Sequence, residues 1–170
     1  MLNETNNLGL SPAFEPIVAT GKNSAMPHYR GSDVKIRDYV LIDYGVKYKF
    51  YNSDLTRCFF LKKDRRKEEA YSKLKSIVYE IIDNLQSFST GADIARFSEK
   101  LFSRYGLPEQ IHAIGHGLGL DVHETPALNK KSKDKLKNSV LAIEPGVYYK
   151  DFGARFEENI YFDGKKTKIL

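Results

Sequence analysis

The chain has 170 residues, of which 41% are hydrophobic and 29% are charged, and its formal net charge is +5. A chain of this size can bury a substantial core, and we expect a single domain over residues 1–170. No stretch approaches the ~18 apolar residues of a membrane-spanning helix, and the polar first residues lack the apolar segment of a signal peptide. The one cysteine, Cys58, excludes an internal disulfide and predicts a cytoplasmic location.

The basic residues gather in two runs, at 62–67 and at 130–137. Such runs can bind nucleic acid, but no aromatic residues are interleaved with them and no nucleic-acid-binding motif accompanies them. We therefore expect a solvated helix face and a solvated loop, with neither nucleic acid nor a membrane as a partner.

Four short segments in the first third of the chain predict β-strands. They are residues 14–20, 39–45, 48–50 and 55–61, and turn-forming residues separate them. Alternation along 39–45 puts Asp43 on the same face as two large apolar residues and at the end of its strand.

Two helices are predicted in the middle of the chain. Apolar residues recur every three or four positions across 64–87, and Asp64 is the expected N-cap. The second helix covers about 92–105, can be capped by Thr90 or Asp93, and ends where a glycine and a proline follow.

The last third of the chain begins with a glycine-spaced run at 114–126, which a lysine-rich loop follows. Residues 140–149 predict a strand that is broken at Pro145 and Gly146, and residues 154–162 predict the last strand. Strands, then two helices, then strands again favour an α+β fold over a doubly wound sheet.

Five side chains, spread over most of the chain, are candidate metal ligands. Each lies at a predicted strand end or in a glycine-rich turn. Four carboxylates and one imidazole are too much charge to bury without a counter-charge, and two divalent cations would balance them. Carboxylate oxygens are hard donors that suit Mn²⁺, Mg²⁺ or Co²⁺ better than soft metals. The five are Asp43, Asp54, His116, Glu144 and Glu157.

Each of these residues also has an ordinary structural interpretation. Asp43 and Asp54, taken alone, are typical of a solvated pair near a hairpin. His116, between glycines, fits a hydrogen-bonded core histidine equally well, and Glu144 has the alternative of a loop salt bridge. Since Glu157 is followed by a second glutamate on the same strand, the two point to opposite faces and only one can enter a site.

Three further residues are candidates beside such a site. His28 lies in the loop after the first strand, where histidines are commonly just exposed. His123 is not part of the zinc-protease pattern H-E-x-x-H, because Ala127 stands in place of the second histidine. We interpret His123 as facing substrate or supporting the ligands. Arg155 shares a strand face with Glu157 and can orient or balance it.

Together these segments resemble the prolidase, aminopeptidase P and methionine aminopeptidase family. The resemblance spans residues 14–162, and it is closer to prolidase and related Xaa-Pro peptidases than to methionine aminopeptidase. It implies the pita-bread fold, which is a curved antiparallel sheet with helices packed on its outer face, and a dinuclear metal site. The matching segments are FEPIVATGKNSAMPHY, VLIDYGVKYKFYNSDLTR, IGHGLGLDVHETP, AIEPGVY and GARFEEN.

The resemblance also implies roles for individual residues. His28 and His123 match the two family histidines that contact substrate near the scissile bond, and Glu144 is the expected proton shuttle. These three are the predicted catalytic residues, and Arg155 is predicted to contact substrate with the two histidines. The implied ligands of the two metal ions are Asp43, Asp54, His116, Glu144 and Glu157, with Asp54 and Glu157 bridging both ions.

Three departures from the family pattern stand out. Family members usually carry further helices of the same domain before the first ligand, so we expect the N-terminal helices to be missing and the catalytic domain to be shortened. Glu158 and Asn159 replace the usual ending of the last motif, and Phe50 and Tyr51 stand where a glycine is common.

The leading hypothesis is a peptidase that hydrolyses Xaa-Pro bonds of a peptide substrate through a hydroxide bridging two divalent metal ions. Mn²⁺ or Co²⁺ is the expected metal, and the donor set also accepts Zn²⁺ or Fe²⁺. One alternative is an N-terminal exopeptidase like methionine aminopeptidase. The other is a truncated, non-catalytic remnant that acts as a binding or scaffold protein. An uncovered apolar sheet face would favour association, and we expect a homodimer.

Overall fold

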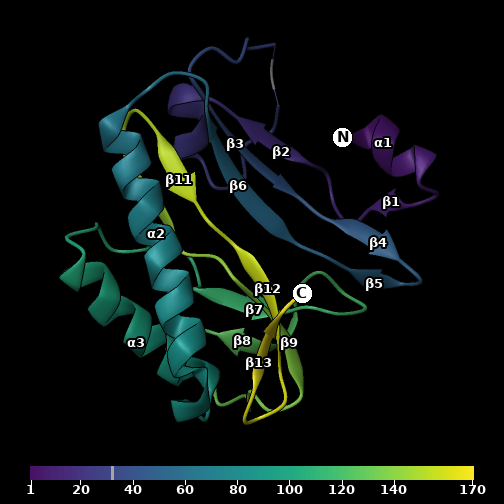
Figure 1. Cartoon of the computed structure of the whole chain (residues 1–170), viewed down its shortest axis with the longest axis vertical. Helices are drawn as coiled ribbons and strands as arrows, with labels where there is room; N and C mark the ends of the chain where they lie inside the picture. Colours follow the sequence, from purple (N-terminus) through teal and green to yellow (C-terminus); the bar gives the residue numbers. More distant parts are fainter. Residues whose placement is uncertain (32) are drawn as a thin grey trace.

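The first half of the chain builds two three-stranded sheets, and the hairpin of the second extends from the first (Figure 1). The structure is a computed structural model and describes residues 1–31 and 33–170. Strands β2, β3 and β6 form the first sheet, in which Asp43 of β3 pairs in register with Thr56 of β6, and β1, β4 and β5 form the second. The elements of this half are α1 (Leu2–Asn7), β1 (Ser11–Pro12), β2 (Ile17–Ala19), η1 (Gly21–Ala25), β3 (Tyr39–Tyr44), β4 (Val46–Tyr48), β5 (Tyr51–Asn52) and β6 (Leu55–Phe60).

The strand predicted at 48–50 is wrong, because the chain reverses there. Strands β4 and β5 pair as a hairpin, and its turn residues Lys49 and Phe50 have φ values of 45° and 75°. Two-residue hairpins need positive φ at both central residues and usually have Asn-Gly there. This chain has a lysine and a phenylalanine at these positions, so the usual turn signal was lacking.

Both predicted helices are present, as α2 (Arg65–Asn84) with a short extension η2 (Leu85–Ser87), and as α3 (Gly91–Arg104). Asp64 caps α2 by accepting a hydrogen bond from the backbone N–H of Lys67. For α3, the cap is Thr90, and Asp93 completes a capping box by accepting from the Thr90 backbone. The predicted helix starts are therefore confirmed to within one residue.

The second half of the chain forms a five-stranded antiparallel sheet and a separate hairpin. The predicted last strand is broken, because Phe156 and Glu157 separate β11 from β12. The break predicted at Pro145 is confirmed, and β7, β8 and β13 were not predicted. The bounds are β7 (Gly115–Gly117), β8 (Glu124–Leu128), β9 (Ser139–Ile143), β10 (Gly146–Tyr148), β11 (Gly153–Arg155), β12 (Glu158–Phe162) and β13 (Thr167–Ile169).

The core lies between the two helices and the strands. Leu74, Ile77 and Ile81 of α2 are fully buried and belong to the same cluster as Leu41 and Leu141 of the sheets. Each such side chain stabilises the fold by roughly 1.5–3 kcal/mol through burial. In Figure 1, α2 and α3 lie on the same side of the strands, and α2 runs beside β11. This arrangement of elements confirms the α+β class.

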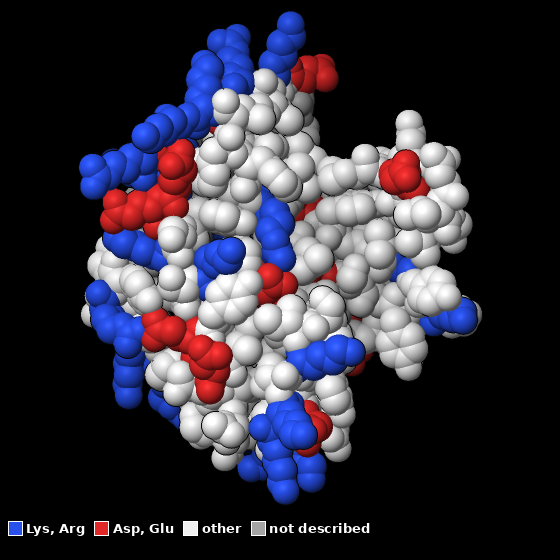
Figure 2. Space-filling model, in the orientation of Figure 1, with Lys and Arg blue, Asp and Glu red and all other residues white. Residues whose placement is uncertain are grey.

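Many basic side chains on the surface are paired with acids. Figure 2 shows Lys and Arg along the left edge, interrupted by patches of Asp and Glu. The paired basic residues include Arg66 with Asp151 and Lys73 with Glu69. Within the described residues, no helix combines the length and the apolar character that crossing a bilayer requires.

Candidate metal centre

Three carboxylates from distant parts of the sequence meet where β3 and β6 lie beside the link between β11 and β12. Asp43 lies near the end of β3, Asp54 immediately precedes β6, and Glu157 lies between β11 and β12. One oxygen of each lies within 4.8 Å of the others. The three residues are 9%, 5% and 2% exposed, so the cluster is shielded from water.

Each of these carboxylates has one buried oxygen that no protein group satisfies. The three atoms are Asp43 Oδ1, Asp54 Oδ1 and Glu157 Oε1. Buried polar atoms are nearly always hydrogen-bonded, and an unpaired buried carboxylate oxygen is costly. Three such oxygens in one place fit a hard divalent cation, which accepts carboxylate ligands from all sides.

The pKa values of the clustered carboxylates also indicate a site for cations. Burial, and after it the negative charges of its neighbours, raises the pKa of Asp54 to about 8 and that of Glu157 well above its ordinary value. Burial likewise raises the pKa of Glu144 to about 7, although the positive charge of Arg155 opposes this. These carboxylates need more positive charge than one arginine provides, and divalent cations would provide it.

His116 is oriented as a ligand by its backbone contact. Its Nδ1 lies 3.0 Å from the carbonyl oxygen of Gly117, so Nδ1 carries the proton and donates it there. The other nitrogen, Nε2, faces Asp54 Oδ2 at 3.6 Å and Glu144 Oε1 at 3.9 Å. Burial lowers the pKa of His116, which keeps the imidazole neutral and its Nε2 lone pair available.

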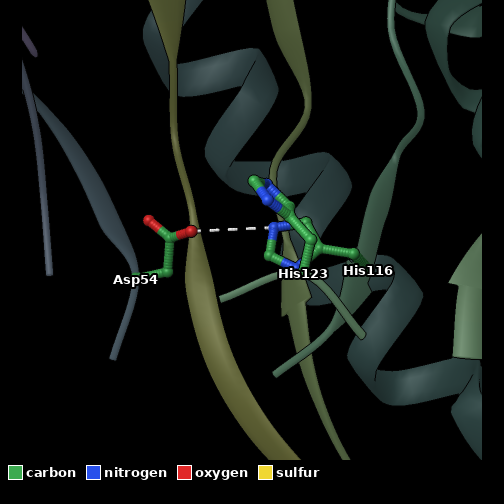
Figure 3. Close-up of side chains that lie close together, drawn as sticks. All are labelled: Asp54, His116 and His123. Atoms are coloured by element: carbon green, nitrogen blue, oxygen red, sulfur yellow. Dashed lines mark ion pairs between the residues drawn. The ribbon is translucent and has the colours of Figure 1, made fainter. Parts of the chain in front are cut away.

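Asp54, His116 and His123 form a second possible ligand group that shares Asp54 with the first (Figure 3). The rings of His116 and His123 lie 4.2 Å apart between centroids, and both project toward Asp54. The two groups therefore overlap at one carboxylate, which has two oxygens. This is an arrangement in which neighbouring cations can share a ligand.

Arg155 lies beneath the carboxylates and is only 3% exposed. Its Nη2 donates to Asp43 Oδ2 at 2.5 Å, and its Nε donates to the hydroxyl of Thr56 at 2.9 Å. The Thr56 hydroxyl in turn donates to Glu157 Oε2 at 2.8 Å. Arg155 therefore reaches Asp43 directly and Glu157 through Thr56.

A third chain of contacts leads from Arg155 to His112. Arg155 Nη1 donates to the hydroxyl of Tyr148 at 2.9 Å, and this hydroxyl lies 2.8 Å from His112 Nε2. Because an arginine only donates, the tyrosine proton must point to His112. Burial lowers the pKa of His112 to about 4 and raises that of Tyr148 to about 12, so both are neutral near pH 7.

The remaining predicted residues lie around this centre. Glu158 pairs with Arg57 at 2.7 Å, and of the two adjacent glutamates only Glu157 belongs to the three-carboxylate group. His28 is exposed in the loop after η1.

Four residues of the centre were missed from the sequence. Thr56 and Asn159 lie two residues after predicted ligands, and both are buried polar side chains. His112 stands four residues before His116, and Tyr148 four residues after Glu144. A signal was present, since a polar side chain in a strand next to a ligand needs a partner. The spacing of these residues in the sequence does not predict which partner each side chain contacts.

Comparison with known proteins identifies the class. The sequence matches metallopeptidase family M24 over residues 1–163, and the chain belongs to that family. It is 40% identical over 159 residues to an uncharacterized peptidase of Methanocaldococcus jannaschii, covering 88% of this chain and 44% of that protein. It is 34% identical over 165 residues to an Xaa-Pro dipeptidase of Pyrococcus horikoshii, covering 94% and 47%.

The fold has the same relatives. The crystal structure of a prolidase from Thermococcus sibiricus superposes with a TM-score of 0.87 at 36% identity, covering 97% of this chain and 47% of that one. The predicted resemblance and the predicted fold are thus confirmed. The chain spans about half the length of the relatives that it matches.

Proposed function

We propose that the chain carries the catalytic centre of a metal-dependent peptidase that hydrolyses Xaa-Pro bonds. The proposal depends mainly on three carboxylate oxygens without hydrogen-bond partners, at Asp43, Asp54 and Glu157. They lie beside the neutral imidazole of His116, whose Nε2 lone pair is available to a metal. The substrate class is taken from the relatives, among which is an Xaa-Pro dipeptidase.

Two divalent ions fit the side chains present. The carboxylates of Asp43, Asp54 and Glu157 would hold one ion. Asp54 and Glu157, with His116 and Glu144, would take part in holding the other. When bound, such a pair would lower the pKa of water enough for it to act as a nucleophile near neutral pH, and would polarise a carbonyl. Mn²⁺ or Co²⁺ matches the mostly oxygen donor set, and Zn²⁺ or Fe²⁺ is compatible with the imidazole.

The protein groups around the ions have separate tasks. Glu144 would take a proton from the attacking water and deliver it to the leaving nitrogen. His123, exposed beside His116, would donate a hydrogen bond to the oxygen that becomes negative. His28 would position the scissile amide. The leaving nitrogen of a prolyl peptide has no N–H, so its ring must be recognised by shape.

Hydrolysis of Xaa-Pro dipeptides by this chain, with added Mn²⁺ or Co²⁺, tests the proposal. We expect metal-dependent turnover of the Xaa-Pro dipeptides, which Asp54→Asn abolishes. A Met-Ala peptide should be cleaved more slowly. Preferred cleavage of the Met-Ala peptide would favour the methionine aminopeptidase alternative. A folded chain that binds two ions and cleaves neither peptide would reject the proposal and favour the scaffold alternative. The homodimer stays a prediction, which light scattering on the same sample checks.

A further inference from the structure

The hydroxyl of Thr56 joins Arg155 to Glu157 by two hydrogen bonds. Thr56 is fully buried in β6, and its Oγ1 lies 2.9 Å from Arg155 Nε and 2.8 Å from Glu157 Oε2. A valine would fill the same volume, so the requirement for volume does not explain why a polar residue lies here. The hydroxyl needs an explanation from its two contacts.

The chemistry of the two partners fixes where the hydroxyl proton points. An arginine Nε–H can only donate, so the Thr56 oxygen accepts from it. The single proton of Thr56 is then directed to Glu157 Oε2, and the second oxygen, Oε1, is left without a protein partner. At Asp43 the pattern repeats, because Arg155 takes Oδ2 and leaves Oδ1 without a partner.

We propose that Thr56 is a positioning residue that holds Glu157, and through Arg155 also Asp43, with one oxygen of each free for a cation. The arrangement serves the three-carboxylate group of Asp43, Asp54 and Glu157. His116 belongs to the other group, lies on β7 in a different sheet, and is oriented by the Gly117 carbonyl. Because Glu157 is expected to serve both ions, removal of the Thr56 hydroxyl is expected to weaken binding of the ion pair, whereas the orientation of His116 should not change.

Thr56→Val is the direct test, because it keeps the volume and removes both hydrogen bonds. Loss of a group that orients metal ligands typically lowers metal affinity about 10–100-fold. We expect a loss of this size in the overall Mn²⁺ affinity of the ion pair. Thr56→Ser restores the hydroxyl and is expected to bind within about threefold of the original chain. Thr20→Val is the matched control, since the Thr20 hydroxyl bonds only a backbone carbonyl, that of Tyr39.

The measurements are calorimetric titration of the metal-free chain with Mn²⁺ and electron paramagnetic resonance of the loaded chain. The resonance distinguishes a coupled ion pair from a single ion. In Thr56→Val we expect the coupled signal to require a higher Mn²⁺ concentration than in the Ser and Thr20 variants. Should Thr56→Val not fold, Thr56→Cys, with a similar size and a weak donor, is expected to have intermediate affinity.

The proposal is overturned if Thr56→Val binds both ions like the original chain. It is also overturned if the affinity falls and Thr56→Ser does not restore it, since that marks a purely structural role. The proposal rests on the metal-binding part of the proposed function and not on peptide cleavage. A chain that binds two Mn²⁺ ions without turnover would reject the peptidase and leave Thr56 fully testable, whereas a chain that binds none would overturn both.

Discussion

Replacement of Arg155 by methionine removes the only positive charge that contacts Asp43 among the described residues. Arg155 is 3% exposed and donates to Asp43, Thr56 and Tyr148. Breaking a buried ion pair by removing one partner costs about 3–5 kcal/mol, because the other charge stays buried and unpaired. In a domain of this size, 1 kcal/mol shifts the melting temperature by about 2–4 °C, so the melting temperature should fall by roughly 10 °C.

The assay is thermal unfolding of the metal-free chain at pH 7, followed by circular dichroism. Arg66→Met is the matched control, because Arg66 pairs with Asp151 where both side chains are more than half exposed, and such pairs contribute about 0–1 kcal/mol. Added Mn²⁺ should recover much of the loss in Arg155→Met, since the cation neutralises the same carboxylates. A metal-free Arg155→Met chain that melts within about 2 °C of the original would refute this account of the cluster.

Three further outcomes are expected. Asp54 and Glu144 have pKa values of about 8 and 7, above their ordinary 3.8 and 4.5; the stability that these groups contribute at low pH is therefore lost as the pH rises, and the metal-free melting temperature should fall between pH 6 and 8.5 but not with Mn²⁺ present. Gly91→Ala would place a Cβ 1.9 Å from the Ala127 carbonyl oxygen, so urea unfolding should show a loss of about 1–3 kcal/mol; an unchanged midpoint would contradict that contact. Phe50→Gly relieves a φ of 75° at a side chain that is 79% exposed, so the chain should gain about 1 kcal/mol, and a lower melting temperature would show that the phenyl ring packs usefully.

Periodicity and capping residues predicted the helices well. Apolar residues recur every three or four positions along α2, and only a helix places them all on one face. The caps at Asp64 and Thr90 follow from local hydrogen bonding. The short strands were harder to predict. At Phe50 the turn lacks its usual residues. At Glu157 a strand-like sequence is interrupted at the position where its carboxylate lies within 4.8 Å of those of Asp43 and Asp54.

The candidate ligands were found because carboxylates at the ends of apolar strands are unusual, and because the order of the segments resembles a known family. Thr56 and Tyr148 were not found, because their importance depends on contacts with Arg155, 99 and 7 residues away in sequence. The identity of a partner across such distances is decided by the packing of two sheets, which no local pattern encodes.

Asn159 has a consequence for how the protein comes into being. Its side-chain amide bonds both the backbone N–H and the backbone C=O of Asp54, which lies 105 residues earlier. Closing a loop of that length is entropically costly until the intervening elements are packed. A nascent chain that has not yet reached β12 therefore holds most of its acids but cannot gather them, so the cluster of Asp43, Asp54 and Glu157 assembles only late in folding.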